Sequence, residues 1–187
     1  MSAEGRFRAS GWRGREVEIP RAAGRQGPIL LEFTGGLTSI FQVDMLRRSA
    51  TRKDHGGQLL RVYGPRVHRA LLPVGYDRVI VTRVRPRSSS GSGVSRWRLR
   101  TVEAAELPVL TDTLSGKVAG LVYFDARARV AFVWQGSTEH GELRFTSVAG
   151  FRTERLSREG ATRGVVTVPG SGFLTVSTSE KWTLERR

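Results

Sequence analysis

Residues 29–45 read ILLEFTGGLTSIFQVDM, two short apolar runs separated by a Thr-Gly-Gly turn. Apolar and polar side chains alternate in the second run, which is typical of a half-buried β-strand. Residues 120–136, GLVYFDARARVAFVWQG, align with this stretch at a constant offset of 91 residues. The offset pairs Leu30 with Leu121, Leu31 with Val122, Phe33 with Phe124 and Phe41 with Phe132. This alignment predicts that the chain contains one β-rich scaffold twice.

The same order of features continues downstream, with loops of different length between them. The first match is between Leu59-Leu60 with Gly64 and Leu143 and Phe145 with Gly150. The second is between Leu72-Pro73 and Val168-Pro169, and the third is between Trp97-Arg98-Leu99 and Trp182-Thr183-Leu184. A period of roughly 90 residues is the size of a domain, well above the period of solenoid repeats. We therefore expect a module at 7–105, a second module at 112–187, and a disordered N-terminus at 1–6.

Turn residues interrupt the apolar runs about every 8–12 residues, as in sandwiches and barrels. The strands predicted for the first module are Glu16–Ile19, Ile29–Thr34, Ile40–Leu46, Gln58–Tyr63, Val67–Leu72, Arg78–Val84 and Arg96–Val102. Those predicted for the second are Lys117–Phe124, Ala131–Gln135, Glu142–Ser147, Phe151–Leu156, Gly164–Val168, Phe173–Ser177 and Lys181–Glu185. No long window keeps a helical period. The pattern predicts an all-β protein of two similar antiparallel β-sandwich modules, jelly-roll-like, in tandem.

Composition excludes several classes of function. The chain has no cysteine, which rules out disulfides, thiolate metal sites and a cysteine nucleophile. The three histidines, His55, His68 and His140, are far apart and form no metal-binding motif. No P-loop, dinucleotide-binding or nucleophile-elbow motif is present. We therefore expect a protein that is not an enzyme and that binds neither a metal nor a cofactor.

The hydropathy of the chain gives an expectation about its location. No apolar run approaches the 18 or so residues of a transmembrane helix, and the first 20 residues contain no apolar core of a secretory signal. We expect a cytoplasmic protein without a membrane span.

Positive charge is concentrated in the first module. The chain carries a formal net charge of +14, and residues 26–105 contain 14 basic and 5 acidic residues, whereas residues 106–187 contain 11 and 9. Such asymmetry indicates an anionic partner. Only three of the 31 basic residues are lysines, and a GC-rich genome produces the same bias, so the charge alone leaves both explanations open.

Ten basic residues are the candidates for binding an anionic macromolecule or an acidic protein surface. They are Arg47, Arg48, Arg52, Lys53, Arg83, Arg85, Arg87, Arg96, Arg98 and Arg100. Alternation along 83–87 and along 96–100 places each set on one side of a strand, roughly 6.5–7 Å apart. If these segments pair as a hairpin, like charges face each other, which is destabilising unless an anion lies between them. Sheet twist or interleaved carboxylates would also relieve that conflict.

Aromatic residues divide into two groups. Phe33, Phe41, Phe124, Phe132, Trp97 and Trp182 recur at matching positions and are expected in the duplicated core. Trp12 and Trp134 have no such match, which makes them candidates for a partner surface, with packing in the core as the alternative.

Short motifs along the chain carry a resemblance to a known module. They are Ser10-Gly11, Val17–Pro20, Gly27–Leu31, Phe41–Val43, Leu59-Leu60, Leu72-Pro73 and Trp97–Leu99. Together they resemble a small all-β repeat module of actinobacterial proteins, often found beside TerD-type, tellurium-resistance-associated domains. The second copy is expected to lack the opening strand and the Gly-Pro. The resemblance implies a binding or scaffolding role in a stress-related assembly. The Asp-Gly-Asp usual before the tryptophan is replaced at 94–96 and 179–181, which puts cation binding in doubt.

These observations favour a non-catalytic protein that binds an anionic partner through the arginine-rich side of its first module. A structural subunit of a homo- or hetero-oligomeric, stress-related assembly is the second hypothesis. A carbohydrate-binding or hydrolytic jelly roll is the third.

Overall fold

The computed structural model describes residues 7–21, 27–37, 39–47, 55–84, 96–117, 119–135, 141–150, 153–158, 160–178 and 180–187. The chain divides into two compact units, Met1–Val102 and Glu103–Arg187. The expected disordered segment, residues 1–6, lies outside the described residues.

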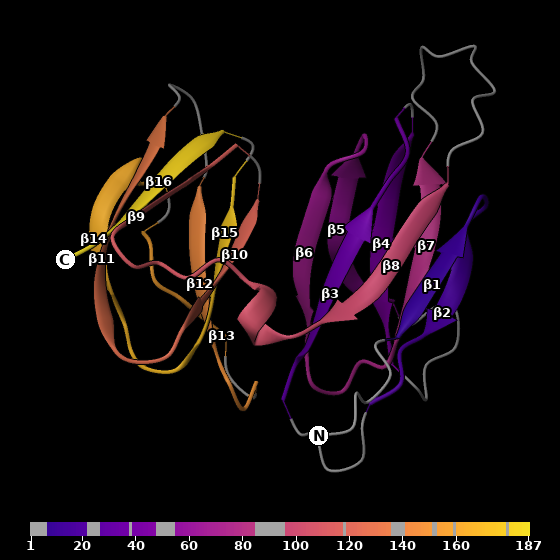
Figure 1. Ribbon diagram of the computed structural model, residues 1–187, viewed down its shortest axis with the longest axis horizontal. Coiled ribbons are helices and arrows are strands. Elements are labelled where there is room, and N and C mark those ends of the chain that lie inside the picture. The colour runs from indigo at the N-terminus through magenta and orange to yellow at the C-terminus, as the bar shows by residue number, and fades with distance from the viewer. Residues whose placement is uncertain are drawn as a thin grey trace. The chain divides into compact units, whose positions relative to one another are not determined.

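The first unit is a sandwich of two four-stranded antiparallel sheets (Figure 1). Its strands are β1 (Arg8–Gly11), β2 (Arg15–Glu18), β3 (Ile29–Thr34), β4 (Ile40–Leu46), β5 (His55–Tyr63), β6 (Val67–Leu72), β7 (Arg78–Val84) and β8 (Trp97–Val102). One sheet has the order β1-β8-β3-β6 and the other the order β2-β7-β4-β5. Gly64, at a φ of 68°, occupies the turn between β5 and β6, where only glycine adopts this conformation without strain.

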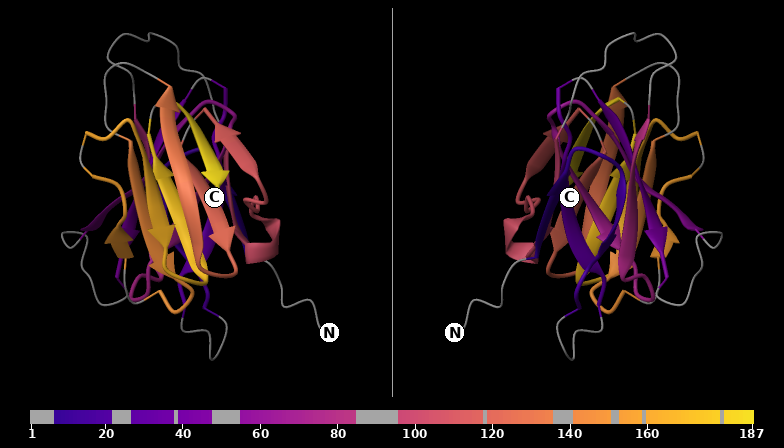
Figure 2. Two further views of the ribbon diagram at one scale, coloured as in Figure 1. Left: turned by 90° about the vertical axis from the view of Figure 1, so that its left-hand side faces the viewer. Right: turned by 90° about the vertical axis from the view of Figure 1, so that its right-hand side faces the viewer.

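The second unit begins with a short 3₁₀ helix, η1 (Ala104–Glu106), and is again a two-layer sandwich (Figure 1). The left-hand view of Figure 2 looks onto the strands of this unit. Its strands are β9 (Thr113–Gly116), β10 (Gly120–Phe124), β11 (Ala128–Gln135), β12 (Glu142–Ser147), β13 (Thr153–Arg155), β14 (Arg163–Val168), β15 (Gly172–Ser177) and β16 (Lys181–Arg186). The sheets have the orders β14-β11-β16-β9 and β10-β15-β12-β13.

Both units have the same topology. Adding eight to each strand number of the first unit reproduces the strand orders of the second. Eight antiparallel strands that alternate between two sheets in this order form a jelly roll. The predicted fold, two similar antiparallel β-sandwich modules in tandem, is confirmed.

The alignment at an offset of 91 residues is nevertheless wrong by one strand. It places β3 on β10, whereas the topology makes β3 equivalent to β11. Phe33 and Phe132 each lie opposite the leucine two residues after the tryptophan of the closing strand, so Phe33 corresponds to Phe132 and not to Phe124. Apolar strands of similar composition resemble one another, and unequal loops shifted the best local match to a neighbouring strand.

The opening strand was missed in both units. β1 and β9 are four residues long and pair along the edge of β8 and β16. Gly11 lies opposite Trp97 and Gly116 opposite Trp182, each preceded by a serine. The expectation that the second copy lacks an opening strand is therefore wrong.

Each unit has its own hydrophobic core between its two sheets. In the first, Phe33 is stacked on Trp97 with ring centroids 6.0 Å apart and contacts Phe41 at 5.9 Å. In the second, Phe132 packs against Trp134 at 5.0 Å. Alternation along the strands directs these side chains inward, so the intervening residues form the outer faces.

Candidate anion-binding face

Arginines gather on the outer face of the β1-β8-β3-β6 sheet. Trp97 and Leu99 belong to the core, so Arg96, Arg98 and Arg100 project from the opposite side of the same strand. β1 adds Arg8, whose backbone lies directly opposite that of Arg100. We call the outward-facing set Arg8, Ser10, Glu32, Thr34, Arg96, Arg98 and Arg100 the arginine face.

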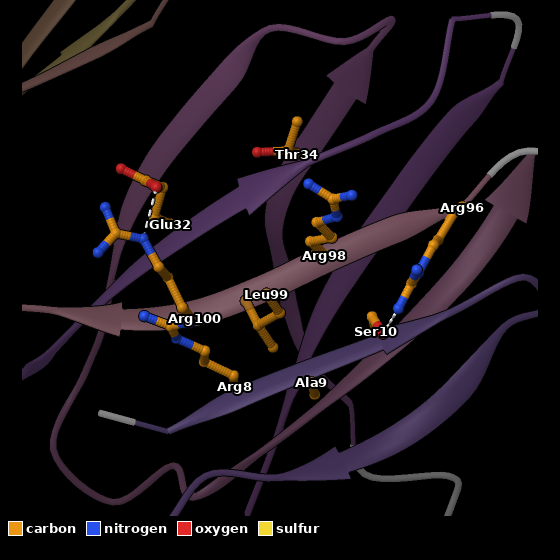
Figure 3. Close-up of a pocket in the computed structure, with 9 residues that line it drawn as sticks. All are labelled: Arg8, Ala9, Ser10, Glu32, Thr34, Arg96, Arg98, Leu99 and Arg100. Atoms are coloured by element: carbon orange, nitrogen blue, oxygen red, sulfur yellow. Dashed lines mark hydrogen bonds and ion pairs between the residues drawn. The ribbon is translucent and has the colours of Figure 1, made fainter. Parts of the chain in front are cut away.

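The arginine face encloses a depression of about 490 Å³ (Figure 3). All seven residues of the face line it, together with Ala9 and Leu99, whose side chains turn toward the core. Four guanidinium groups and two hydroxyl groups therefore line a hollow in which Glu32 supplies the one carboxylate.

Glu32 is engaged by two arginines. Its Oε1 accepts a hydrogen bond of 2.7 Å from Arg100 Nε, and its Oε2 accepts one of 3.0 Å from Arg69 Nε on β6. Partial burial raises the pKa of Glu32, but the hydrogen bonds and positive charges of Arg100 and Arg69 outweigh it, and the net effect lowers the pKa below the ordinary 4.5. The carboxylate is thus ionised at neutral pH and shared between two cations.

The other arginines of the face have no carboxylate partner in the described part of the chain. Arg8 is opposite Arg100, a pairing of like charges that destabilises a sheet. Arg96 donates a hydrogen bond of 2.9 Å to Ser10 Oγ, and no ion pair involves Arg8, Arg96 or Arg98 among the described residues. The face therefore carries positive charge that its own acidic residue does not balance.

Trp12 follows β1 at one end of the arginine face. Its side chain is 53% exposed, and the Arg96 guanidinium lies 6.0 Å from the centroid of its ring. Contact between a guanidinium and an aromatic ring is attractive, so Arg96 places an exposed aromatic plane beside the row of cations.

The hairpin that would bring Arg83 against Arg96 and Arg98 does not form. β7 and β8 belong to different sheets, because the jelly-roll order takes the chain from one layer to the other between these strands. Arg83 lies opposite Phe41, on the side of β7 that carries the buried Val79 and Val81.

Of the remaining predicted basic residues the structure describes Arg47, which is not part of the arginine face. Arg47 follows β4, in the other sheet, and its guanidinium lies 5.3 Å from the ring centroid of Tyr76. Arg48, Arg52, Lys53, Arg85 and Arg87 lie outside the described residues.

The prediction that Trp134 belongs to a partner surface is wrong. Its side chain is 4% exposed, and its Nε1 donates a hydrogen bond of 2.7 Å to the carbonyl oxygen of Ala161. Trp134 continues the inward-facing series Ala128, Val130 and Phe132 along β11, so alternation buries it.

The second unit shows what the same face looks like without the arginines. Cross-strand pairing makes Arg8, Arg69, Arg96, Arg98 and Arg100 equivalent to Thr113, Val165, Lys181, Thr183 and Glu185. Five positive charges in one unit thus correspond to one positive and one negative charge in the other. The scaffold does not require arginine at these positions.

Sequence reasoning missed Arg8, Ser10, Glu32 and Thr34. Arg8 and Ser10 alternate in the four-residue run RASG, a signal too short to stand out without its pairing partner. Glu32 and Thr34 alternate with core residues in a strand that was predicted, but their neighbours come from distant segments.

Among the described residues, no group of three or more histidine or acidic side chains could hold a metal ion. The helical segment of the described chain is far too short to cross a membrane.

His68 on β6 provides a test of pH dependence. It is 6% exposed, and its Nε2 has no hydrogen-bond partner among the described residues. Burial first, and the charge of Arg66 second, lower the pKa of His68 below the ordinary 6.5. The unfolded chain therefore takes up this proton before the folded chain does, so stability falls as pH decreases below about 6.5.

We expect the melting temperature of His68→Leu to fall less than that of the wild type between about pH 7 and pH 5. At still lower pH both proteins should lose the stabilisation that ionised Glu32 provides, because a carboxyl with a lowered pKa stabilises the fold only until it is protonated. Thermal unfolding across the pH range measures both effects. If the melting temperatures of the two proteins changed equally with pH between pH 7 and pH 5, protonation of His68 would not be a cause of the loss of stability.

Comparison with known proteins adds little to this site. No protein-family model and no curated protein matches the chain, so the resemblance to modules beside TerD-type domains stays a prediction. Similar solved structures include a chain of Sulfolobus Turreted Icosahedral Virus (TM-score 0.34, 10% identity, covering 97% of this chain and 89% of that chain).

Two further structures are the CUB1-EGF-CUB2 domain of human MASP-1/3 (TM-score 0.26, 8% identity, 98% and 99% covered) and Ruminococcus gnavus β-glucuronidase (TM-score 0.28, 14% identity, 87% and 30% covered). TM-scores this low carry no argument about fold or function.

Proposed function

We propose that this chain is a non-catalytic binding protein whose first unit binds an anionic macromolecule on the arginine face. The observation that carries this proposal is the depression lined by Arg8, Arg96, Arg98 and Arg100, in which the one carboxylate is already shared by two arginines. An anion in this hollow would supply a counter-charge for Arg8, Arg96 and Arg98, which have no carboxylate partner among the described residues.

The chemistry of the side chains supports an anionic ligand. Arginine keeps its charge at any physiological pH and presents a planar fork of donors that matches phosphate and carboxylate groups. The Ser10 and Thr34 hydroxyl groups lie among the guanidinium groups and add neutral donors. The equivalent face of the second unit has no arginine at the positions of Arg8, Arg96, Arg98 and Arg100. This difference supports a role that is specific to the first unit.

The double variant Arg8→Ser, Arg98→Ser tests the proposal. Because each solvent-exposed guanidinium would contribute a hydrogen bond worth about 0.5–1.5 kcal/mol to the ligand, we expect the affinity for fluorescein-labelled polyphosphate to fall about 5–150-fold. The slope of log affinity against log salt should become less steep by about two, one for each arginine removed. Fluorescence anisotropy over a salt series measures both quantities.

The second unit supplies the matched control. Arg129→Ser, Arg163→Ser removes the same charge from exposed positions on its equivalent sheet. We expect this control to keep nearly the wild-type affinity. Equal weakening by the two double variants would show diffuse attraction to net charge and would contradict a site on the arginine face.

A further inference from the structure

The exposed aromatic ring and the cations of the arginine face form one continuous surface. Trp12 directly follows β1, which carries Arg8 and Ser10, and Arg96 contacts both Trp12 and Ser10. The indole ring therefore lies at the end of the row of guanidinium groups. Large aromatic side chains that remain exposed beside a charged hollow are suited to stacking against a planar ligand group.

The arginines repeat along an extended line. Arg96, Arg98 and Arg100 are two residues apart on one strand, so their backbone positions follow one another at roughly 6.4–6.8 Å. Arg8 on the adjacent strand widens the row at the end away from Trp12. A flexible polymer with one anion per repeat unit can place successive charges on such a row, whereas a single small anion would occupy one position only.

We infer that the ligand of this face is a single-stranded nucleic acid, with phosphates on the arginine row and a base stacked on Trp12. This inference rests on the proposed function and names its ligand. Single-strand binding typically combines a positively charged track for the backbone with aromatic side chains on which bases stack. In a duplex the base faces are covered by their neighbours, so an indole ring would have nothing to stack on. Acidic peptides and sulfated glycans supply charge without a planar base.

The test separates phosphate binding from base stacking. The probes are a fluorescein-labelled oligothymidylate of about ten nucleotides, a length typical of small single-strand-binding domains, and an abasic oligomer with the same phosphates. Because stacking contributes about 1–3 kcal/mol per base, we expect Trp12→Ala to weaken oligothymidylate binding roughly 5–150-fold. Binding of the abasic oligomer should not change, and Trp12→Phe should retain most of the affinity for oligothymidylate.

Tyr63 provides the matched control for this variant. It is also 53% exposed and is contacted by the guanidinium of Arg61 at 5.7 Å, but it lies on β5 in the other sheet. Tyr63→Ala should leave the binding of both oligomers unchanged. Unfolding midpoints establish that each variant is folded at the temperature of the binding assay.

The outcomes distinguish the inference from the proposed function. If the wild-type protein binds neither oligomer nor polyphosphate, the proposed function fails. If it binds them all through Arg8 and Arg98 but Trp12→Ala has no selective effect on oligothymidylate, the proposed function stands and the inference is overturned. The inference would also be overturned if duplex DNA or heparin bound more tightly than the oligothymidylate and this binding did not depend on Trp12. Base-dependent binding that is lost in Trp12→Ala and retained in Tyr63→Ala supports it.

Discussion

Replacing Trp97 with alanine is expected to lower the free energy of unfolding of the first unit by about 3–5 kcal/mol. Trp97 is fully buried and is stacked on Phe33 with an angle of 15° between the rings. Its Nε1 donates a hydrogen bond of 2.9 Å to the carbonyl oxygen of Arg13, and the Arg15 guanidinium lies 5.4 Å from the ring. Alanine would remove all three interactions and leave a cavity between two sheets that can close only in part.

Hydrogen–deuterium exchange locates this loss. Phe33 and Trp97 belong to a core that is separate from that of the second unit, so peptides covering β3 and β8 should lose protection while those covering β11 and β16 keep theirs. Trp182→Ala, at the equivalent position, should give the opposite pattern. A loss below about 1 kcal/mol for Trp97→Ala would contradict the prediction, because surface substitutions commonly cost that little.

Strand positions were largely predictable because alternation is a local property. Ile29–Thr34 and Arg78–Val84 were predicted with the bounds that the structure has. The four-residue strands β1 and β9 were not, because RASG contains no large apolar residue and TLSG contains only one, Leu114, which is too few to show alternation. Their strand conformation depends on pairing with β8 and β16, which no local pattern reveals.

The candidate site was predictable only in part for the same reason. Alternation identified the side of β8 that carries Arg96, Arg98 and Arg100, but not the strands beside it. The segments expected to form a hairpin lie in different sheets. The true neighbours, Arg8 and Glu32, are 92 and 68 residues away from Arg100 in the sequence. Pairing partners in a jelly roll are set by the global topology and not by local composition.

The strand-by-strand equivalence of the two units separates residues that the fold needs from residues that it does not need. Residues that match between them, such as Trp97 and Trp182 or Phe33 and Phe132, lie in the cores. Residues that differ include all four arginines of the arginine face, whereas Ser10 is matched by Ser115. Because the second unit keeps the same fold with Thr113, Lys181, Thr183 and Glu185 at the positions of the four arginines, folding alone does not explain the arginines.

Gly116, in the Ser-Gly pair of β9, is the position of the second large effect. Replacing it with alanine is expected to lower the free energy of unfolding of the second unit by about 1–3 kcal/mol. An added Cβ would lie only 2.4 Å from Cε2 and Cζ2 of Trp182. Trp182 is 4% exposed and belongs to the core, so its ring cannot move aside without disturbing the packing around it. The backbone of Gly116 does not require a positive φ, and the cost is therefore steric.

Denaturant unfolding monitored by circular dichroism measures this cost, and the chain supplies graded controls for Gly116→Ala. Gly11→Ala, whose Cβ would lie 2.9 Å from Trp97, should cost less because a smaller shift relieves the contact. Gly170→Ala, with no atom within 4 Å of its Cβ, should be neutral or slightly stabilising. The double variant Gly116→Ala, Trp182→Phe should lose less free energy of unfolding than the sum of the losses of the two single variants, because the smaller ring removes part of the clash. If Gly116→Ala were as stable as Gly170→Ala, close approach of the tryptophan would not be the reason for glycine in this strand.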